Sequence, residues 1–234
     1  MGEFARLSAV LFEPSAAFRD IAAHPRWWPP VAIIIVLSLA FMYTFNQRVG
    51  FERFYRQQAE TNSQMQKMNP AQREQTIAVQ VKIAPAIFYG LSVIGTPVMA
   101  AIVAAVFLLI FKTFLGAQIR FGQIYAVCCY ALVPLIFSSV MAFAMLLLKE
   151  PDQFDLQNAT PSNIAAFLDA TSTPKWLYTL LSSLDVFTLW SVVLLATGLS
   201  VASRKVSWSS ALVWVVATWG LWVALKVGMT AAFS

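Results

Sequence analysis

The sequence predicts an all-α polytopic membrane protein with five transmembrane helices and a short amphipathic N-terminal segment. It contains five long apolar stretches, and a helix needs about 20 apolar residues to cross a hydrocarbon core about 30 Å thick. Hydrophobic residues make up 59% of the 234 residues and charged residues 12%, whereas a soluble domain carries about 25% charged residues. The predicted spans are residues 28–46, 84–111, 121–148, 177–202 and 208–230.

Amphipathic sequence precedes the first span. Phe18 and Ile21 fall on one face of a helix and Arg19 on another, a pattern typical of helices that lie in the headgroup layer. Trp27 and Trp28 follow, and indole rings prefer the membrane interface. These five residues are therefore predicted to contact the membrane surface. The alternative is that the apolar face packs on the protein's own loops.

The rest of the chain reads as one membrane domain, residues 28–232, after an N-terminal segment of residues 1–27. One polar insertion, residues 47–83, separates the first two spans. Within it Asn69 suits a helix N-cap and Pro70 suits the first helical position. We therefore expect helical extensions with a turn near Asn69.

Prolines interrupt two of the predicted spans. Pro85 and Pro97 lie in the second and Pro134 in the third. Each removes one backbone hydrogen bond and tends to kink its helix. Such kinks can mark a hinge or cavity, but prolines also occur in membrane helices for packing alone.

No catalytic constellation is present in the sequence. His24 is the sole histidine, so neither a histidine-rich metal site nor a serine-histidine triad can be assembled. Phosphate-loop, dinucleotide-binding and HExxH patterns are absent. The net charge of +5 suits anionic lipid headgroups, because no basic domain exists to hold a duplex. The sequence predicts no enzyme activity, no cofactor or metal, and no nucleic-acid partner.

Asp185 is the exception in an otherwise uncharged predicted interior. An ionisable residue within a span costs about 2.5–3.5 kcal/mol on insertion scales, so it needs a partner or water. It is either an ion or proton site or a structural group. Lys226 lies almost as far after the turn at Lys205 as Asp185 lies before it, which predicts an Asp185–Lys226 pair. In the alternative, Asp185 bonds Thr188, Ser182 or a tyrosine while Lys226 reaches the headgroups.

Three stretches resemble the Yip domain family, the Ypt-interacting integral membrane proteins, in its bacterial form. The first is FEPSAAFRDIAAHPRWWPP. The second, FLGAQIRFGQIYAVCCYALVPL, carries Tyr130 and Pro134. The third, SLDVFTLWSVVLLATGLSVASRKVSWSSAL, carries Asp185, Trp190 and Gly198 and is the most specific. These five positions, with Lys226, are the candidate intramembrane residues.

The resemblance implies five spans with a cytoplasmic N-terminus and an outside C-terminus, although the distribution of basic residues among the loops is ambiguous. Relatives in eukaryotes are associated with Rab-type GTPases and vesicle budding, and the family has no known reaction. The chain lacks the long proline-rich tail of those relatives, which suggests a bacterial cytoplasmic (inner) membrane.

The expected function is therefore that of a non-enzymatic, membrane-organising or trafficking-type scaffold that recruits partners. Its expected partners are the lipid bilayer and other membrane proteins or further copies of the chain, with GTPase binding by family analogy only. The alternative is a small transporter, channel or lipid-translocating protein that uses a polar site around Asp185.

Overall fold

A computed structural model describes the chain except residues 152–153, 155, 157, 170–171 and 233–234. The regular elements that it describes are helices, with one isolated β-bridge between Asn163 and Asp185. In chain order they begin with α1 (Glu3–Phe12), α2 (Pro14–Ala23), α3 (Trp28–Arg48), α4 (Phe51–Thr61), α5 (Ser63–Gln66) and α6 (Pro70–Thr113). They continue with α7 (Phe121–Ala131), α8 (Pro134–Leu148), the 3-10 helix η2 (Ile164–Phe167), α9 (Lys175–Ser183), α10 (Val186–Ser203) and α11 (Trp208–Ala232).

Five candidate membrane spans are found among the described residues: α3, α6, the α7–α8 pair, α10 and α11. The predicted all-α fold with five spans is confirmed. The fourth span differs from its prediction, because residues 177–202 do not form one helix. α9 ends at Ser183, the backbone leaves the helical conformation at Leu184, and α10 begins after Asp185.

The interior prolines differ in their effect. α6 runs for 44 residues and continues through Pro85 and Pro97. Between α7 and α8, by contrast, the helix is interrupted at Leu132 and Val133, directly before Pro134. Proline lacks an N–H and suits the first turn of a helix. Pro134 therefore starts a second helix within the third span, where it is buried.

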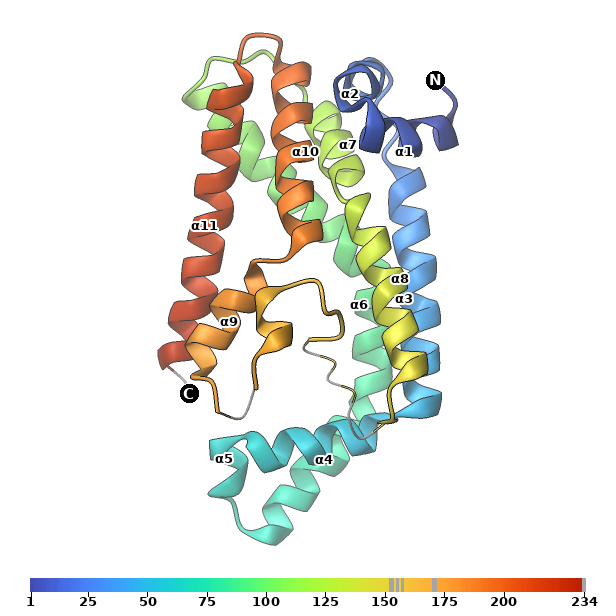
Figure 1. Cartoon of the computed structure of the whole chain (residues 1–234), viewed down its shortest axis with the longest axis vertical. Helices are drawn as coiled ribbons and strands as arrows, with labels where there is room; N and C mark the ends of the chain where they lie inside the picture. Colours follow the sequence, from blue (N-terminus) through green and yellow to red (C-terminus); the bar gives the residue numbers. More distant parts are fainter. Residues whose placement is uncertain (152–153, 155, 157, 170–171, 233–234) are drawn as a thin grey trace.

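The polar insertion is helical, as predicted for residues 47–83. α4, α5 and the first turns of α6 extend from one end of the bundle (Figure 1). Asn69 caps α6, since its side-chain oxygen accepts a hydrogen bond from the Gln72 backbone N–H at 2.8 Å. Arg56 on α4 pairs with Glu74 on α6 at 2.8 Å and joins the two helices. The predicted turn near Asn69 is confirmed.

The other end of the bundle carries the N-terminal hairpin, formed by α1 and α2. α2 packs against α7 and α10, close to the tight turn between α10 and α11 (Figure 1). Side chains from these helices form the main hydrophobic core, which includes Phe18, Ile21, Ile124, Tyr130 and Leu199. Many other apolar side chains of the spans point outward, as expected where the surrounding solvent is itself hydrocarbon.

Candidate functional site

A cluster of polar side chains lies where α9, η2 and the start of α10 meet. Figure 1 shows α10 beginning partway along α11, with α9 beside the remaining part of α11. The backbone is irregular here, which is tolerated at membrane depth only where protein or water satisfies its polar groups. We call these residues the polar cluster: Asn158, Thr160, Ser162, Asn163, Tyr178, Asp185 and Thr188.

Asp185 is the centre of the polar cluster and is only 9% exposed. One carboxylate oxygen accepts hydrogen bonds from the Thr188 backbone N–H at 3.0 Å and from the Thr188 hydroxyl at 3.3 Å. The Ser162 hydroxyl donates to the other oxygen. The Val186 N–H donates to the Ser162 carbonyl at 3.1 Å, beside the bridge to Asn163. Asp185 thus caps α10 and fastens the preceding loop to it.

Asn163 is the second buried polar residue of the cluster. Its amide group donates to the Asn158 side-chain oxygen at 2.7 Å and to the Thr160 carbonyl at 3.2 Å. Its own side-chain oxygen accepts from the Ala166 N–H at 3.1 Å and caps η2. Asn158 in turn donates to the Tyr178 hydroxyl on α9 at 2.8 Å. The loop, η2, α9 and α10 are therefore joined by one hydrogen-bond network.

Every buried side-chain polar atom among the described residues has a hydrogen-bond partner. Within the same residues there is no group of three potential metal-binding side chains. The predicted Asp185–Lys226 pair is wrong: no ion pair joins them in the described part of the chain, and Lys226 is exposed. The prediction assumed one unbroken fourth helix, but α10 begins only after Asp185, and the preceding helix α9 packs on α11 instead. The Thr188 partner named in the alternative is confirmed.

Gly198 marks a second site, where the N-terminal hairpin docks on the bundle. A Cβ atom added at Gly198 on α10 would lie 2.5 Å from Val127 Cγ1 on α7 and 2.9 Å from the Phe18 ring on α2. Only glycine lets the three helices approach this closely. Gln123, at the start of α7, donates to the Ala22 carbonyl of α2 at 2.9 Å and adds a polar link.

Arg6 holds the two helices of the N-terminal hairpin together and is 3% exposed. Its guanidinium contacts Asp20 at 2.7 Å and Glu3 at 3.4 Å, and donates to the His24 carbonyl at 3.3 Å. Arg26 also pairs with Glu3, at 2.9 Å. A buried charge needs such partners, because desolvation without them is costly.

The pKa values of Arg6 and Asp20 move apart. Burial alone lowers the pKa of Arg6, but the hydrogen bond and charge of Asp20, with the charge of Glu3, raise it above its ordinary value. Burial alone raises the pKa of Asp20, but hydrogen bonds and charges from Arg6 and the amino terminus lower it overall. Both groups are therefore held in their charged forms.

The structure corrects the predicted membrane-surface contacts of Phe18 and Ile21. Both are fully buried by protein in the main core, so the apolar face of α2 contacts the bundle and not lipid. Arg19 lies on the outer face, and Trp27 and Trp28 are exposed next to the start of α3. An amphipathic pattern shows which face is apolar but does not show whether protein or lipid covers it.

The other candidate residues fall into two groups. Tyr130 is fully buried, and its hydroxyl donates to Glu3 of the N-terminal hairpin at 3.5 Å. Trp190 is exposed on α10 and stacks on Phe137 of α8, with ring centroids 6.3 Å apart. Tyr130, like Gly198, belongs to the docking site of the hairpin, whereas Trp190 lies on the outside of the bundle.

Several residues of both sites were not singled out from the sequence. Ser162, Asn163 and Asn158 lie in a loop without a recognisable pattern, and only the density of short polar side chains there could have indicated a network. Arg6 lies on α1, but its partner Asp20 lies on the next helix. Hydrophobic periodicity describes one helix at a time and does not reveal ion pairs between helices.

The fold and these sites define a five-span helical membrane protein with a docked N-terminal helical hairpin. The Yip1 domain matches residues 8–228, nearly the whole chain. The chain therefore belongs to the Yip1 domain family. No curated protein and no solved structure matches it.

Gly198→Ala is expected to destabilise the protein. The new methyl group overlaps the buried Val127 and Phe18 side chains, and overpacking of this kind costs about 1–3 kcal/mol. Thermal unfolding in detergent measures the loss. Gly220→Ala on α11 is the matched control, because a Cβ there meets nothing within 4 Å. Equal unfolding temperatures for the two variants contradict the close approach.

Docking of the N-terminal hairpin is expected to weaken in acid. Because the pKa of Asp20 is lowered in the folded protein, its contribution is present above the ordinary value of about 3.9 and is lost as the pH falls through the lowered native value. Trypsin cleavage after Arg19, following brief exposure to each pH, reports undocking. Asp20→Asn is expected to cleave faster near neutral pH and to show a flatter pH profile. Identical pH profiles of cleavage for Asp20→Asn and the unsubstituted protein count against the Arg6–Asp20 ion pair.

Asp185→Ala is expected to lower stability, because a lost N-cap alone costs about 0.5–2 kcal/mol. Denaturant unfolding in mixed micelles provides two double-mutant cycles. With Ser162→Ala the losses are expected to be non-additive, by about 0.5–3 kcal/mol for groups in direct contact. With Lys226→Met they are expected to add, because the structure separates the two charges. Additive losses with Ser162→Ala, together with non-additive losses with Lys226→Met, would instead indicate that Asp185 pairs with Lys226.

Proposed function

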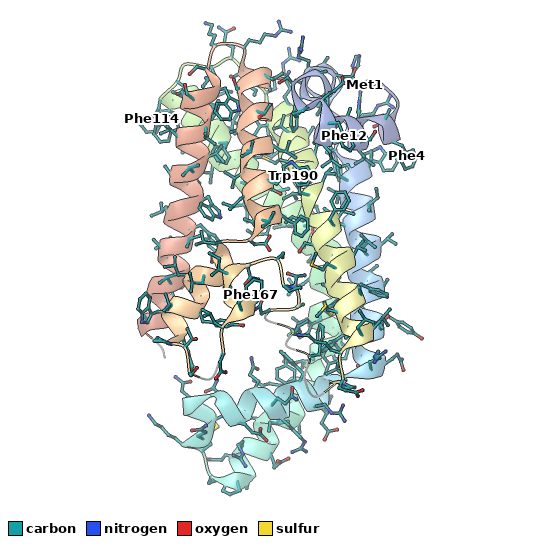
Figure 2. All side chains as sticks on the ribbon, in the orientation of Figure 1. Met1, Phe4, Phe12, Phe114, Phe167 and Trp190 are labelled. Atoms are coloured by element: carbon teal, nitrogen blue, oxygen red, sulfur yellow. The ribbon has the colours of Figure 1, made fainter. Side chains whose placement is uncertain are left out.

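We propose that the protein is a non-enzymatic membrane-organising scaffold that acts through its N-terminal hairpin. In this proposal α1 lies in the headgroup layer with its outer face in lipid, while α2 is fixed to the bundle. The observation that carries it is the outer face of α1, where Phe4 is 77% and Phe12 82% exposed (Figure 2).

The geometry of α1 supports a lipid-facing role. Phe4 and Phe12 are eight residues apart, close to two helical turns, and so share one face. The opposite face carries the buried Arg6 and Val10. Since α1 packs on α2 and α3, its exposed phenylalanines lie at the end of a membrane span. A helix with one exposed apolar face in that position is typical of interfacial segments.

Charge at the same end supports contact with anionic headgroups. The tight turns between α6 and α7 and between α10 and α11 lie at the end that carries the hairpin (Figure 1). Exposed basic side chains gather there, and each can contribute about 1 kcal/mol of attraction to an anionic surface. They are Arg19, Lys112, Arg120, Arg204 and Lys205.

The proposed orientation follows from these turns. Basic residues in short loops favour the cytoplasmic side, so we place the N-terminus there and, with five spans, the C-terminus outside. A bacterial cytoplasmic membrane as the host rests on the sequence resemblance alone. Recruitment of other membrane proteins, self-association and GTPase binding are proposed by family analogy. The polar cluster is fully hydrogen-bonded within the protein, so it favours a structural role for Asp185 over transport.

The protein is expected to concentrate on curved membranes. A shallow apolar helix expands one leaflet, and curved bilayers accommodate this expansion more easily. After reconstitution into a mixture of small and large vesicles, the amount of protein per membrane area is expected to be higher on the small ones. Substitution of both Phe4 and Phe12 by Ser is expected to remove the enrichment.

Phe167→Ser is the matched control, because Phe167 is 84% exposed but lies far from α1 along the chain. It is expected to leave the enrichment unchanged. Cysteine labels at positions 2 and 229, in a background without Cys128 and Cys129, identify the vesicle face that carries each terminus. Equal distribution of the unsubstituted protein over both vesicle sizes rules out the curvature role. Labelling of both positions from one side rules out the orientation.

A further inference from the structure

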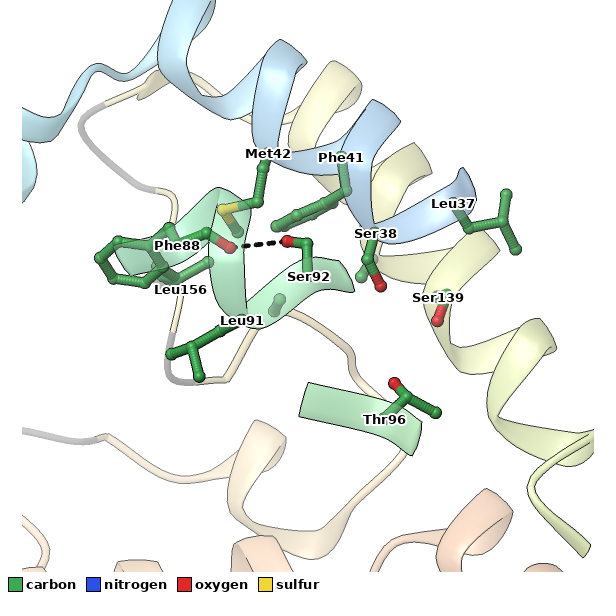
Figure 3. A pocket seen from close by; sticks show the side chains of 12 residues that line it. Leu37, Ser38, Phe41, Met42, Phe88, Leu91, Ser92, Thr96, Ser139 and Leu156 are labelled. Carbon is green, nitrogen blue, oxygen red and sulfur yellow. Dashed lines mark hydrogen bonds between the residues drawn. The ribbon is translucent and has the colours of Figure 1, made fainter. Parts of the chain in front are cut away.

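A cavity of about 340 Å³ lies between α3, α6 and α8 (Figure 3). Large apolar side chains line it from α3 and α6, among them Phe41, Phe88 and Leu91. Leu156, from the loop after α8, lies beside Phe88 in Figure 3. We call this the α3–α6–α8 cavity.

Helix packing explains why this space is present. α3 packs on both α6 and α8, whereas α6 and α8 make no extensive contact with each other. The side chains that face the gap from α3 and α8 include the small residues Ser38, Ser139 and Ala142. Small residues facing a gap leave volume that larger ones would fill. The cavity is therefore bounded mainly by three spans, and Leu156 and Ala159 of the loop after α8 also line it.

The lining suits a hydrocarbon ligand. Among the described residues, no charged side chain lines the cavity. Two of the hydroxyl groups that line it are already used, since Ser92 donates to the Phe88 carbonyl at 2.8 Å and Ser139 to the Leu135 carbonyl at 2.9 Å. A polar solute placed here would replace few of the hydrogen bonds that it makes to water, which is costly. An apolar chain would lose nothing of this kind.

We propose that the α3–α6–α8 cavity binds one acyl chain of a membrane phospholipid. The helices that line it are candidate spans, so the liquid outside the cavity is hydrocarbon. Leu91 lines the cavity and is also 56% exposed, which makes the cavity continuous with the lipid-facing surface of α6. Its volume reaches the lower end of the range for ligand sites, about 300–1,000 Å³. A chain in the cavity gives the lining side chains the dispersion contacts that an unfilled space lacks.

This inference is independent of the curvature role of α1. The α3–α6–α8 cavity uses none of the residues of the N-terminal hairpin, so either proposal can fail without the other. It assigns the protein a specific lipid site within the bundle, in addition to the general contact of its spans with the bilayer.

Photo-crosslinking in lipid bilayers tests the proposal. The protein is reconstituted with a phospholipid that carries a diazirine on one acyl chain, and cross-linked residues are mapped by tandem mass spectrometry. A parallel sample contains a diazirine-labelled free fatty acid. Cross-links from the phospholipid are expected at Ser38, Phe88 and Leu91, above the level at Leu109, which is an exposed position elsewhere on α6.

Ala142→Phe fills the α3–α6–α8 cavity and is expected to reduce its cross-links about tenfold, the change that 1.4 kcal/mol of binding free energy produces. Ala144→Phe is the matched control, because Ala144 lies exposed on the same helix, and it is expected to leave them unchanged. Ser139→Leu provides a second filled cavity if Ala142→Phe fails to fold. Cross-links no stronger than at Leu109, or insensitive to both filling variants, overturn the proposal. Labelling by the free fatty acid alone overturns the assignment to phospholipid.

Discussion

The bilayer requires every backbone polar group at membrane depth to find a hydrogen-bond partner, and this requirement governs the second half of the molecule. α10 begins only after Asp185, and the chain before it runs through an irregular loop, η2, α9 and a turn. Asp185 and Asn163 make this possible, because their side chains form hydrogen bonds with backbone groups that no helix satisfies. Asp185 accepts from the Thr188 N–H, and Asn163 donates to the Thr160 carbonyl. Without the polar cluster, the fourth span would have to be one longer helix.

A different solution operates at the N-terminal end. Here a buried arginine, Arg6, is compensated by carboxylates of its own hairpin, and the hairpin is then fixed to the bundle by shape at Gly198. The charge network sets the angle between α1 and α2, whereas the close approach sets the position of α2 on α7 and α10. As a consequence, the exposed face of α1 is presented by a rigid body and not by a flexible arm.

The sequence predicted the membrane fold because hydrophobic length is a local property. The helix start at Asn69 was also readable, since capping acts within one turn. The effect of the interior prolines was not, because Pro134 starts a new helix whereas α6 continues through Pro85 and Pro97. The break in the fourth span was not, because residues 177–202 are apolar enough for one helix and the partners of Asp185 come from a loop about 20 residues earlier. The burial of Phe18 could not be predicted for the same reason, because it depends on the absence of a side chain at residue 198, about 180 positions away.

In these proposals the protein therefore meets the membrane in two different ways. Around α1 the surface protrudes, with the exposed phenylalanines Phe4 and Phe12 extending outward from the protein (Figure 2). Between α3, α6 and α8 the surface is concave, because small side chains of α3 and α8 leave space there, and the loop after α8 also lines this space. The convex face can disturb lipid packing, because it inserts into one leaflet. The concave face can order a lipid, because it holds one chain against three helices. The scaffold proposed above needs no chemistry beyond these two shapes, which agrees with the hydrogen-bond partners found for every buried polar side-chain atom in the described part of the chain.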